Sequence, residues 1–137
     1  MKTQSGFSLI EVLVSIVILS VALLGTAGLM GASMRNTNTA YMRSQATVLA
    51  DDYLDRMRAN VSDAIAGRYN VDLGPSCGSG GGLAGWDCAE WTTNVTNTLP
   101  GGDAEVRVTN TGVVTVQINW GDDADGNANS FVTQSRL

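Results

Sequence analysis

The chain begins with a short polar leader that is followed by a long apolar stretch. Residues 1–6 carry one positive charge, on Lys2, and residues 7–34 contain a single charged residue, Glu11. As a helix, about 28 residues extend about 42 Å, which is enough to cross the roughly 30 Å hydrocarbon core of a bilayer. The stretch is longer than the apolar part of a secretory signal and lacks a small-x-small cleavage site. The pattern therefore predicts a membrane-spanning helix.

After Arg35 the pattern becomes amphipathic, which predicts that the same helix continues to about residue 62. No proline interrupts this part, and Gly67 marks an expected stop. Asp52 and Arg56, four residues apart, are expected to form an ion pair. Apolar residues recur at steps of three or four, as on one face of a helix that packs on its own globular domain; they are Ala46, Ala50, Leu54, Met57, Val61 and Ile65, with Leu49 and Tyr53 widening the stripe.

A second, shorter helix is expected after an irregular segment. Residues 68–82 contain Pro75 and a serine- and glycine-rich run at 79–82, which indicates a loop. The helical period returns at Leu83 and ends before residues 100–102, which read Pro-Gly-Gly. Its apolar positions are Ala84, Cys88, Trp91, Val95 and Leu99. We expect Trp91 to anchor the core rather than to line a ligand site.

The apolar period then changes to two residues, which predicts β-strands. Residues 104–109 and 114–120 form two such segments, joined by a turn at 110–112. A polar loop at 121–129 leads to a third antiparallel strand at 130–136. The expected fold is therefore α+β, with a long helix, a short helix and a meander of three or four strands.

Composition narrows the functions that the chain could perform. Without residues 1–6, seven arginines stand against thirteen acidic residues, so the side chains carry a net charge of −6. An acidic chain without a basic stripe argues against direct binding of nucleic acid. The chain has no histidine, so the usual Ser-His-acid and Cys-His arrangements cannot form. We expect neither an enzyme nor a cofactor.

Two arrangements in the sequence have side chains of the kinds that bind metals. Asp122, Asp123, Asp125 and Asn127 offer oxygen ligands at the spacing of a calcium loop, but the glycine falls at Gly126 and no glutamate closes the loop. A solvated hairpin loop is the favoured interpretation. Two thiolates without histidine do not complete a zinc site. We therefore expect no metal.

Cys77 and Cys88 are the only cysteines, and they are eleven positions apart. In an exported chain such a pair most simply forms one disulfide. Closing so short a loop would stabilise the fold by about 3 kcal/mol in the loop-entropy description.

The start of the apolar stretch resembles the processing site of type IV prepilins and of the related pseudopilins. The resemblance rests on the segment Gly6-Phe7-Ser8-Leu9-Ile10-Glu11 behind a short basic leader. It implies that a prepilin peptidase cuts between Gly6 and Phe7 and methylates the new amine of Phe7. It also implies that Glu11 is the assembly residue, which meets the amine of an adjacent subunit. A plain signal anchor, the alternative, leaves Glu11 and its position unexplained.

Further segments resemble the PilV class of minor pilins, namely residues 23–29, 43–46 and 55–60, with a weaker likeness at 99–102. This resemblance implies a structural subunit that helps to start assembly of the type IV pilus. It implies three parts: a leader at 1–6, a transmembrane and filament-core half at 7–34, and a periplasmic headgroup at 35–137. The protein would lie in the inner membrane before assembly and in the pilus afterwards. Implied partners are the prepilin peptidase, other minor and major pilins and the assembly platform, with a pilus-tip adhesin as a further option.

Two other functions stay open from the sequence. A minor pseudopilin of a type II secretion system shares the leader, Phe7 and Glu11. A membrane-anchored periplasmic binding domain that never polymerises is the more distant alternative, and an uncleaved leader would favour it.

Three glycines in the apolar half, Gly25, Gly28 and Gly31, have two competing explanations. Glycine destabilises a helix interior by about 0.5–1 kcal/mol relative to alanine, so a reason is expected. Gly28 and Ala32 could allow close helix packing. Alternatively, the family resemblance implies a helix that loosens between about residues 20 and 28 when a subunit enters the filament.

Overall fold

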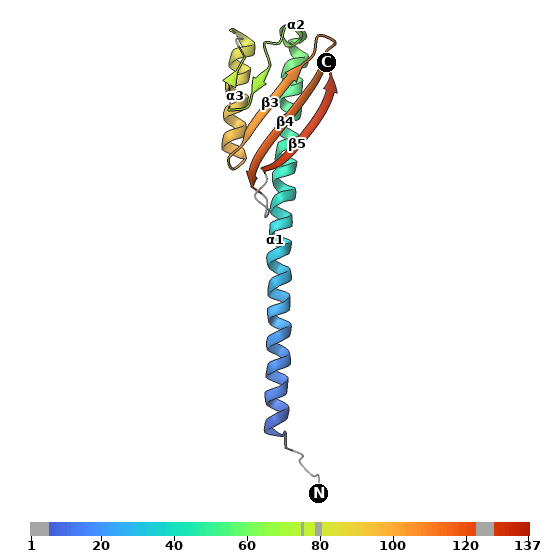
Figure 1. Cartoon of the computed structure of the whole chain (residues 1–137), viewed down its shortest axis with the longest axis vertical. Helices are drawn as coiled ribbons and strands as arrows, with labels where there is room; N and C mark the ends of the chain where they lie inside the picture. Colours follow the sequence, from blue (N-terminus) through green and yellow to red (C-terminus); the bar gives the residue numbers. More distant parts are fainter. Residues whose placement is uncertain (1–5, 75, 79–80, 123–127) are drawn as a thin grey trace. The chain divides into compact units, whose positions relative to one another are not determined.

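The computed structural model describes residues 6–74, 76–78, 81–122 and 128–137 (Figure 1). The chain divides into two compact units, Met1–Ala40 and Tyr41–Leu137. Helix α1, Leu9–Ala59, contributes its first part to one unit and its last part to the other. The predicted calcium loop falls at residues 122–127, of which only the backbone of Asp122 lies within the described residues.

In the first unit, α1 starts directly after a short non-helical segment. The carbonyl of Ser8 accepts hydrogen bonds from the backbone N–H groups of Glu11, at 3.0 Å, and Val12, at 3.3 Å, and so begins the helix. α1 is the one helix in the described residues that is long and apolar enough to cross a membrane, by length and composition. Almost all of its side chains up to Ala40 are exposed. This unit therefore has no core of its own within the described residues.

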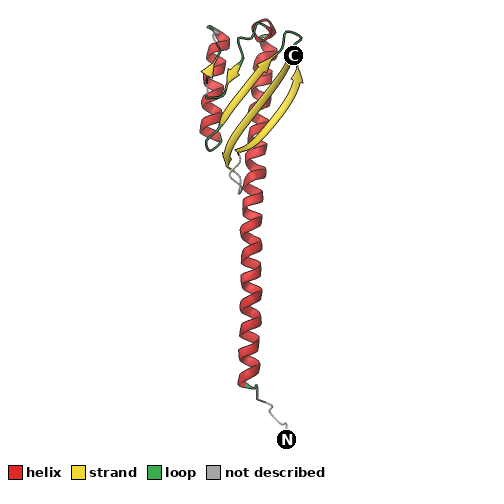
Figure 2. Ribbon diagram, in the orientation of Figure 1, coloured by secondary structure: helices red, strands yellow, loops and turns green. Residues whose placement is uncertain are grey.

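The second unit combines helices with a five-stranded antiparallel sheet (Figure 2). The strands lie in the order β2-β1-β3-β4-β5. After α1 the elements are α2 Val61–Ile65, β1 Val71–Asp72, β2 Ser76–Cys77, α3 Leu83–Thr98, β3 Asp103–Val108, β4 Val113–Asp122 and β5 Ala128–Arg136. The α+β prediction is confirmed, including its three longer strands. The short strands β1 and β2 were not predicted and lie in the segment expected to be irregular.

The end of the long helix differs from the prediction. α1 ends at Ala59, and Asn60 leaves the helical conformation with φ −138° and ψ 58°. This break changes the phase of the following turn, so that α2 buries Ala64 instead of continuing the predicted stripe. Val61 and Ile65 are 38% and 42% exposed. Their assignment to the buried face was therefore wrong, because the predicted period assumed an unbroken helix.

The core of the second unit lies between the last part of α1, α3 and the inner side of the sheet. Tyr53 of α1 stacks on Trp91 of α3, with ring centroids 4.1 Å apart, and both side chains are fully buried. The Trp91 Nε1–H donates a hydrogen bond of 2.7 Å to the carbonyl of Leu49, which satisfies its polar atom. Trp91 is therefore a core anchor, as predicted. From the sheet, every second residue is buried, namely Ala104, Val106, Val114, Val116, Ile118 and Trp120.

The end of α3 requires a glycine for steric reasons. α3 ends at Thr98, just before the predicted Pro-Gly-Gly stop. The Gly102 N–H donates to the carbonyl of Leu99 at 2.9 Å. A Cβ on Gly102 would lie 2.6 Å from the carbonyl oxygen of Val95, a distance that side chains do not tolerate. The close approach lets the chain turn from α3 directly into β3.

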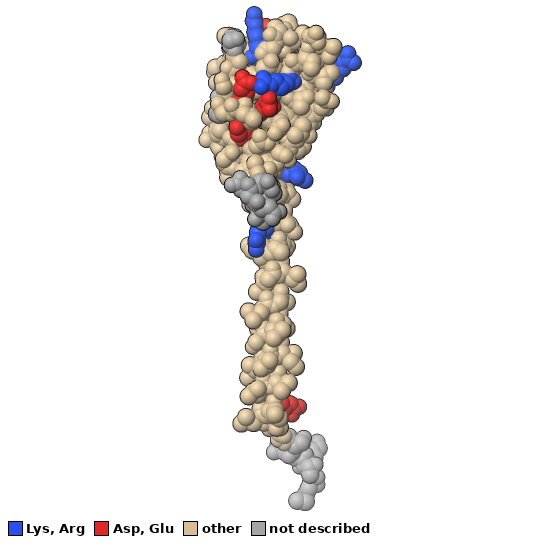
Figure 3. All heavy atoms as spheres, viewed as in Figure 1, with Lys and Arg blue, Asp and Glu red and all other residues tan. Residues whose placement is uncertain are grey.

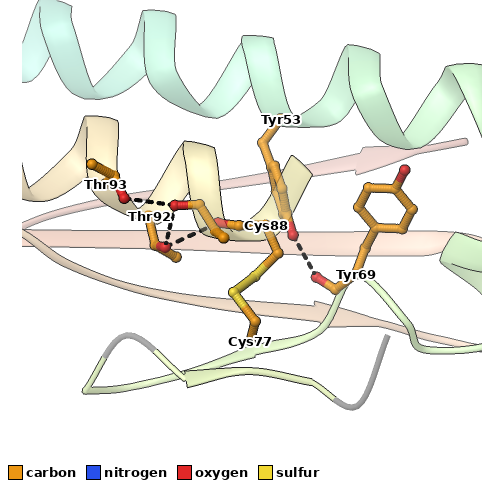
Figure 4. Close-up of a disulfide and its surroundings, with 7 residues drawn as sticks. Tyr53, Tyr69, Cys77, Cys88, Thr92 and Thr93 are labelled. Atoms are coloured by element: carbon orange, nitrogen blue, oxygen red, sulfur yellow. Dashed lines mark hydrogen bonds between the residues drawn. A yellow bond between two sulfur atoms is a disulfide. The ribbon is translucent and has the colours of Figure 1, made fainter. Parts of the chain in front are cut away.

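The disulfide between Cys77 and Cys88 joins β2 to α3 (Figure 4). It spans 5.9 Å between the two Cα atoms. β2 is paired only with β1, at two positions, and β1 is paired with β3 at one position, Val71 with Val106. This edge of the sheet has few ladder hydrogen bonds, so the covalent link supplies much of its attachment.

We predict that replacing Cys88 with serine lowers the free energy of unfolding by about 3 kcal/mol, because the closed loop is lost and a polar group enters a buried position. The measurement is chemical denaturation of the full chain in detergent, with and without reductant. The double variant Cys77→Ala and Cys88→Ala is the control, since it removes the link without burying a hydroxyl. Reductant should destabilise the wild type and leave both variants unchanged. A wild-type protein that is indifferent to reductant would contradict the prediction.

Candidate processing and assembly site

The predicted cleavage bond, Gly6–Phe7, lies in an exposed non-helical segment just before α1. Both residues lack regular structure, and the Phe7 side chain is 84% exposed. A Cβ built on Gly6 would meet no atom within 4 Å, so packing within the described residues does not require a glycine there. A peptide bond outside a helix has no intrahelical hydrogen bond to be broken before a protease can bind it. The geometry leaves this bond accessible.

Glu11 lies in the first turn of α1. A carboxylate at this position interacts favourably with the positive end of the helix dipole. Among the described residues, no side chain forms an ion pair or a hydrogen bond with its carboxylate. The hydroxyl of Ser15 donates to the backbone carbonyl of Glu11, at 2.7 Å, rather than to its side chain. The carboxylate is therefore available to a group outside the described part of the chain.

Glu11 stands in otherwise apolar surroundings. The neighbouring side chains of α1 are large and apolar, and they are half or more exposed; they include Leu9, Ile10, Leu13, Ile16, Leu19 and Leu23. On the face shown in Figure 3, charged atoms gather on the second unit, and the apolar part of α1 shows one acidic group. A helix that is apolar on all sides is suited to a bilayer or to the interior of a helical bundle. In such surroundings an unpaired carboxylate is costly.

Three acidic side chains of the second unit contact one arginine. The Arg56 guanidinium contacts Glu90 at 2.7 Å, Asp52 at 3.0 Å and Asp87 at 3.3 Å, which confirms the expected pair with Asp52. The hydrogen bond to Glu90 is the main cause that raises the pKa of Arg56. Asp87 also accepts a hydrogen bond of 2.8 Å from the Tyr69 hydroxyl. Asp87 and Glu90, both on α3, fasten that helix to α1, whereas the pair between Arg56 and Asp52 lies within α1.

A buried tyrosine completes this network. The Tyr53 hydroxyl donates a hydrogen bond of 3.1 Å to the carbonyl of Tyr69 (Figure 4). Burial of the Tyr53 side chain, followed by the nearby Tyr69 and Asp87, raises its pKa well above the ordinary value of 10.0. Burial also raises the pKa of Tyr69, and its hydrogen bond to Asp87 adds to the effect. Both hydroxyls therefore stay neutral in the folded state, where their proton is needed for the hydrogen bonds.

No group of three or more histidine, cysteine or acidic side chains suited to a metal ion is found in the residues that the structure describes. The two cysteines are joined to each other. Of the acidic network around Arg56, the sequence pattern predicts only the pair with Asp52. Asp87 and Glu90 follow α1 by about thirty residues, and the short-range spacing of charges gives no sign that they meet it.

Comparison with protein families supports the assignment of the amino-terminal segment. Residues 1–27 match the model of the prokaryotic N-terminal methylation motif. The chain therefore carries a prepilin signal like that of type IV pilins, covering the leader, Gly6, Phe7, Glu11 and the first turns of α1. Searches of curated proteins and of solved structures give no match.

Processing can be tested directly on the bond between Gly6 and Phe7. Intact-mass analysis of the protein extracted from membranes is expected to show loss of residues 1–6 and gain of one methyl group. The variant Gly6→Ala should stay at full length, because the peptidase is expected to require a glycine before the cleaved bond. The structure leaves room for the methyl side chain, so a loss of cleavage would not result from misfolding. Cleavage elsewhere, or an unprocessed wild type, would contradict the prediction.

The raised pKa of Tyr53 predicts a loss of stability at alkaline pH. In the unfolded chain the tyrosine ionises near its ordinary pKa of 10.0, whereas in the folded state its pKa lies higher. Its stabilisation is thus complete below pH 10 and is lost as pH rises from 10 toward the folded-state pKa. The free energy of unfolding should fall more steeply between pH 9 and 11 in the wild type than in Tyr53→Phe. At pH 8 that variant should be about 1 kcal/mol less stable, because it lacks one hydrogen bond.

Chemical denaturation of the full chain in detergent at each pH is the measurement. Tyr41→Phe, which alters an exposed tyrosine, is the matched control. Equal slopes for the wild type and Tyr53→Phe would show that Tyr53 does not cause the alkaline loss.

Proposed function

We propose that the protein is a minor pilin of a type IV pilus, of the PilV class. The observation that carries the proposal is the methylation motif at residues 1–27, combined with an exposed Gly6–Phe7 bond that leads directly into an exposed apolar helix. Its role is structural: after processing, the subunit joins a filament and takes part in starting its assembly. The prepilin peptidase, other pilins and the pilus assembly platform are its partners.

The presence of a glycine at position 6 supports the proposed processing, because packing within the described residues does not require a glycine there. A larger side chain at Gly6 would meet open space. Gly6 lies within the matched motif, and recognition of this glycine by the peptidase would explain why it is there. The peptidase would need the small residue to bring the backbone close to its own catalytic groups, as glycine allows.

The apolar part of α1 serves two apolar surroundings in turn. In the inner membrane its exposed side chains face lipid, and in the filament they would face the same part of neighbouring subunits. Between lipid and a helix bundle the hydrophobic free energy changes little, because both are apolar. Assembly then depends on specific contacts, and in residues 7–34 Glu11 has the one charged side chain, to which cleavage would add the amine of Phe7.

The headgroup, residues 35–137, belongs in the periplasm in this proposal. Its disulfide fits an oxidising compartment. Its face between α1 and α3 is fixed by the aromatic stack and the Arg56 network, so it would present a rigid surface to other subunits. The residues that resemble the PilV class at 55–60 include Arg56 and Asn60. Arg56 donates a hydrogen bond to Glu90 of α3, and Asn60 donates one to Asp63 of α2.

A minor pseudopilin of a type II secretion system would carry the same motif. The two functions are separated by the proteins that copurify with the full chain after chemical crosslinking in cells. Pilus components are expected, and mass spectrometry of pili sheared from cells should detect the processed chain. Recovery with secretion components alone would favour the pseudopilin.

Replacing Glu11 tests its role in assembly. We expect Glu11→Ala to reach the membrane at normal or higher levels and to be at least about tenfold depleted from sheared pili. The reason is that removing one partner of a buried ion pair leaves the other charge uncompensated, at a cost of about 3–5 kcal/mol. The pair with the methylated amine of a neighbouring Phe7 would also set the axial register of the subunits.

Two controls make this test specific. Glu11→Gln keeps the size and polarity of the side chain but removes the charge, so it should behave like Glu11→Ala. Asp51→Ala removes an exposed carboxylate of the headgroup and should enter pili normally. If wild type and Glu11→Ala are incorporated equally, Glu11 is simply a hydrated residue near the membrane surface and sets no register.

A further inference from the structure

A shallow hollow runs along one side of the start of α1. Its lining residues follow one another mostly at steps of four, so they share one face of the helix; they are Phe7, Glu11, Val12, Ser15, Ile16 and Leu19. All of them belong to the first unit. Apolar side chains form most of the wall, and the acidic side chain lies near the end where the helix begins.

The hollow is about as long as one leaflet of a bilayer is deep. Glu11 and Leu19 are eight residues apart, which is about 12 Å along a helix axis, and Phe7 extends the hollow beyond Glu11. Half of the hydrocarbon core is about 15 Å thick. A lipid acyl chain that lies in this hollow would therefore run from the membrane surface toward the centre of the bilayer.

The carboxylate of Glu11 is placed to meet the headgroup of such a lipid. The side chain is exposed, and among the residues that the structure describes none pairs with its carboxylate. In a helix the Cα–Cβ bonds tilt toward the amino terminus, so a long side chain extends back toward the start of the helix. The carboxylate is therefore directed toward the membrane surface and away from the centre of the bilayer.

Cleavage between Gly6 and Phe7 would add a positive charge at the same end of the hollow. Phe7 lines the hollow together with Glu11, so its new amine would lie about one helical turn from the carboxylate. This end would then carry one positive and one negative group. A zwitterionic phospholipid headgroup carries the complementary pair, namely a phosphate for the amine and an ammonium for the carboxylate.

Hydrogen bonding would distinguish between the two common kinds of zwitterionic headgroup. A primary ammonium has three N–H donors, as the side chain of lysine does. A trimethylated ammonium has no donor and interacts with a carboxylate only through its charge. Charge-assisted hydrogen bonds are roughly twice as strong as neutral ones. Glu11 therefore favours a headgroup with a primary ammonium.

We propose that this hollow binds a phospholipid whose headgroup carries a primary ammonium. The ammonium pairs with Glu11, the phosphate pairs with the amine of Phe7, and one acyl chain lies along the apolar wall. The inference rests on the proposed function, because cleavage supplies the amine. The lipid would compensate the charge of Glu11 in the membrane before assembly, and the amine of a neighbouring subunit would replace its ammonium in the filament.

The test uses the full chain, extracted from cells that process it and reconstituted in nanodiscs with equal amounts of phosphatidylethanolamine and phosphatidylcholine. Native mass spectrometry identifies the lipids that stay on the protein when it is released. On the cleaved chain we expect phosphatidylethanolamine to be retained about fivefold more than phosphatidylcholine, as expected for one additional charge-assisted hydrogen bond.

Variants show whether Glu11 and the hollow cause this preference. Glu11→Ala and Glu11→Gln remove the charge, and the retention ratio should fall to about one. The double variant Ile10→Glu and Glu11→Ala moves the carboxylate to an exposed position outside the hollow at nearly the same depth, and its ratio should also be about one. Asp51→Ala removes an exposed carboxylate of the second unit and should keep the wild-type ratio. None of these residues belongs to the core, so each variant is expected to fold.

Equal retention of the two lipids by the cleaved wild type, or a ratio that does not change when Glu11 is replaced, would overturn the proposal. A preference that persists in the double variant would also overturn it, because any carboxylate near the membrane surface would then be sufficient. The same spectra give the mass of the protein. A cleaved chain without the preference refutes the lipid site alone, whereas a wild-type chain that keeps residues 1–6 refutes the proposed function as well.

Discussion

The apolar surface of α1 between residues 7 and 34 is the constraint on which the rest of this protein depends. Its side chains find no partner within the described part of the chain, and almost all of them are exposed. Exposed apolar area costs roughly 25 cal/mol per Å² in water, so a helix of this kind is stable only in lipid or against other apolar helices. Glu11 is the one charged residue within this apolar surface, and the core of the chain lies beyond it, in the second unit.

The second unit, in contrast, has a core of its own, although the chain contains few aromatic residues. α1 is joined to α3 through one stacked aromatic pair and through one arginine with two carboxylate partners on α3. The polar atoms of Tyr53 and Trp91 are both hydrogen-bonded to backbone carbonyls, so these large side chains add burial without an unsatisfied group. The disulfide then holds the thin edge formed by β1 and β2, where the ladder is shortest.

The two edge strands of the sheet, β2 and β5, differ in length and in how they are attached. One edge is short and covalently attached to α3, while the other, β5, is long and open. A long strand edge without proline or lysine is one that can pair with another chain.

Much of the fold and the amino-terminal methylation motif could be predicted from the sequence, because those features depend on local patterns. The apolar length of residues 7–34, the position of Glu11 after Gly6 and the period of two in β3 and β4 are all local. Local periodicity failed at Asn60, where one non-helical residue turned Val61 and Ile65 outward. It also missed β1 and β2, which are too short to show a pattern and form only because β3 offers an edge.

What the tertiary structure alone decided are the contacts between residues far apart in the chain. The meeting of Arg56 with Asp87 and Glu90, and the stack of Tyr53 on Trp91, depend on how α3 lies against α1. Which residues of β5 lie opposite those of β4 depends on the register between the two strands, which a shift of one residue would change. The sequence determined by itself where the chain is apolar, where the prepilin motif lies and where the one acidic residue of the apolar stretch stands, since these are properties of consecutive residues. Only the tertiary structure decided the packing and the strand register, because both depend on the geometry between elements that are far apart in the sequence.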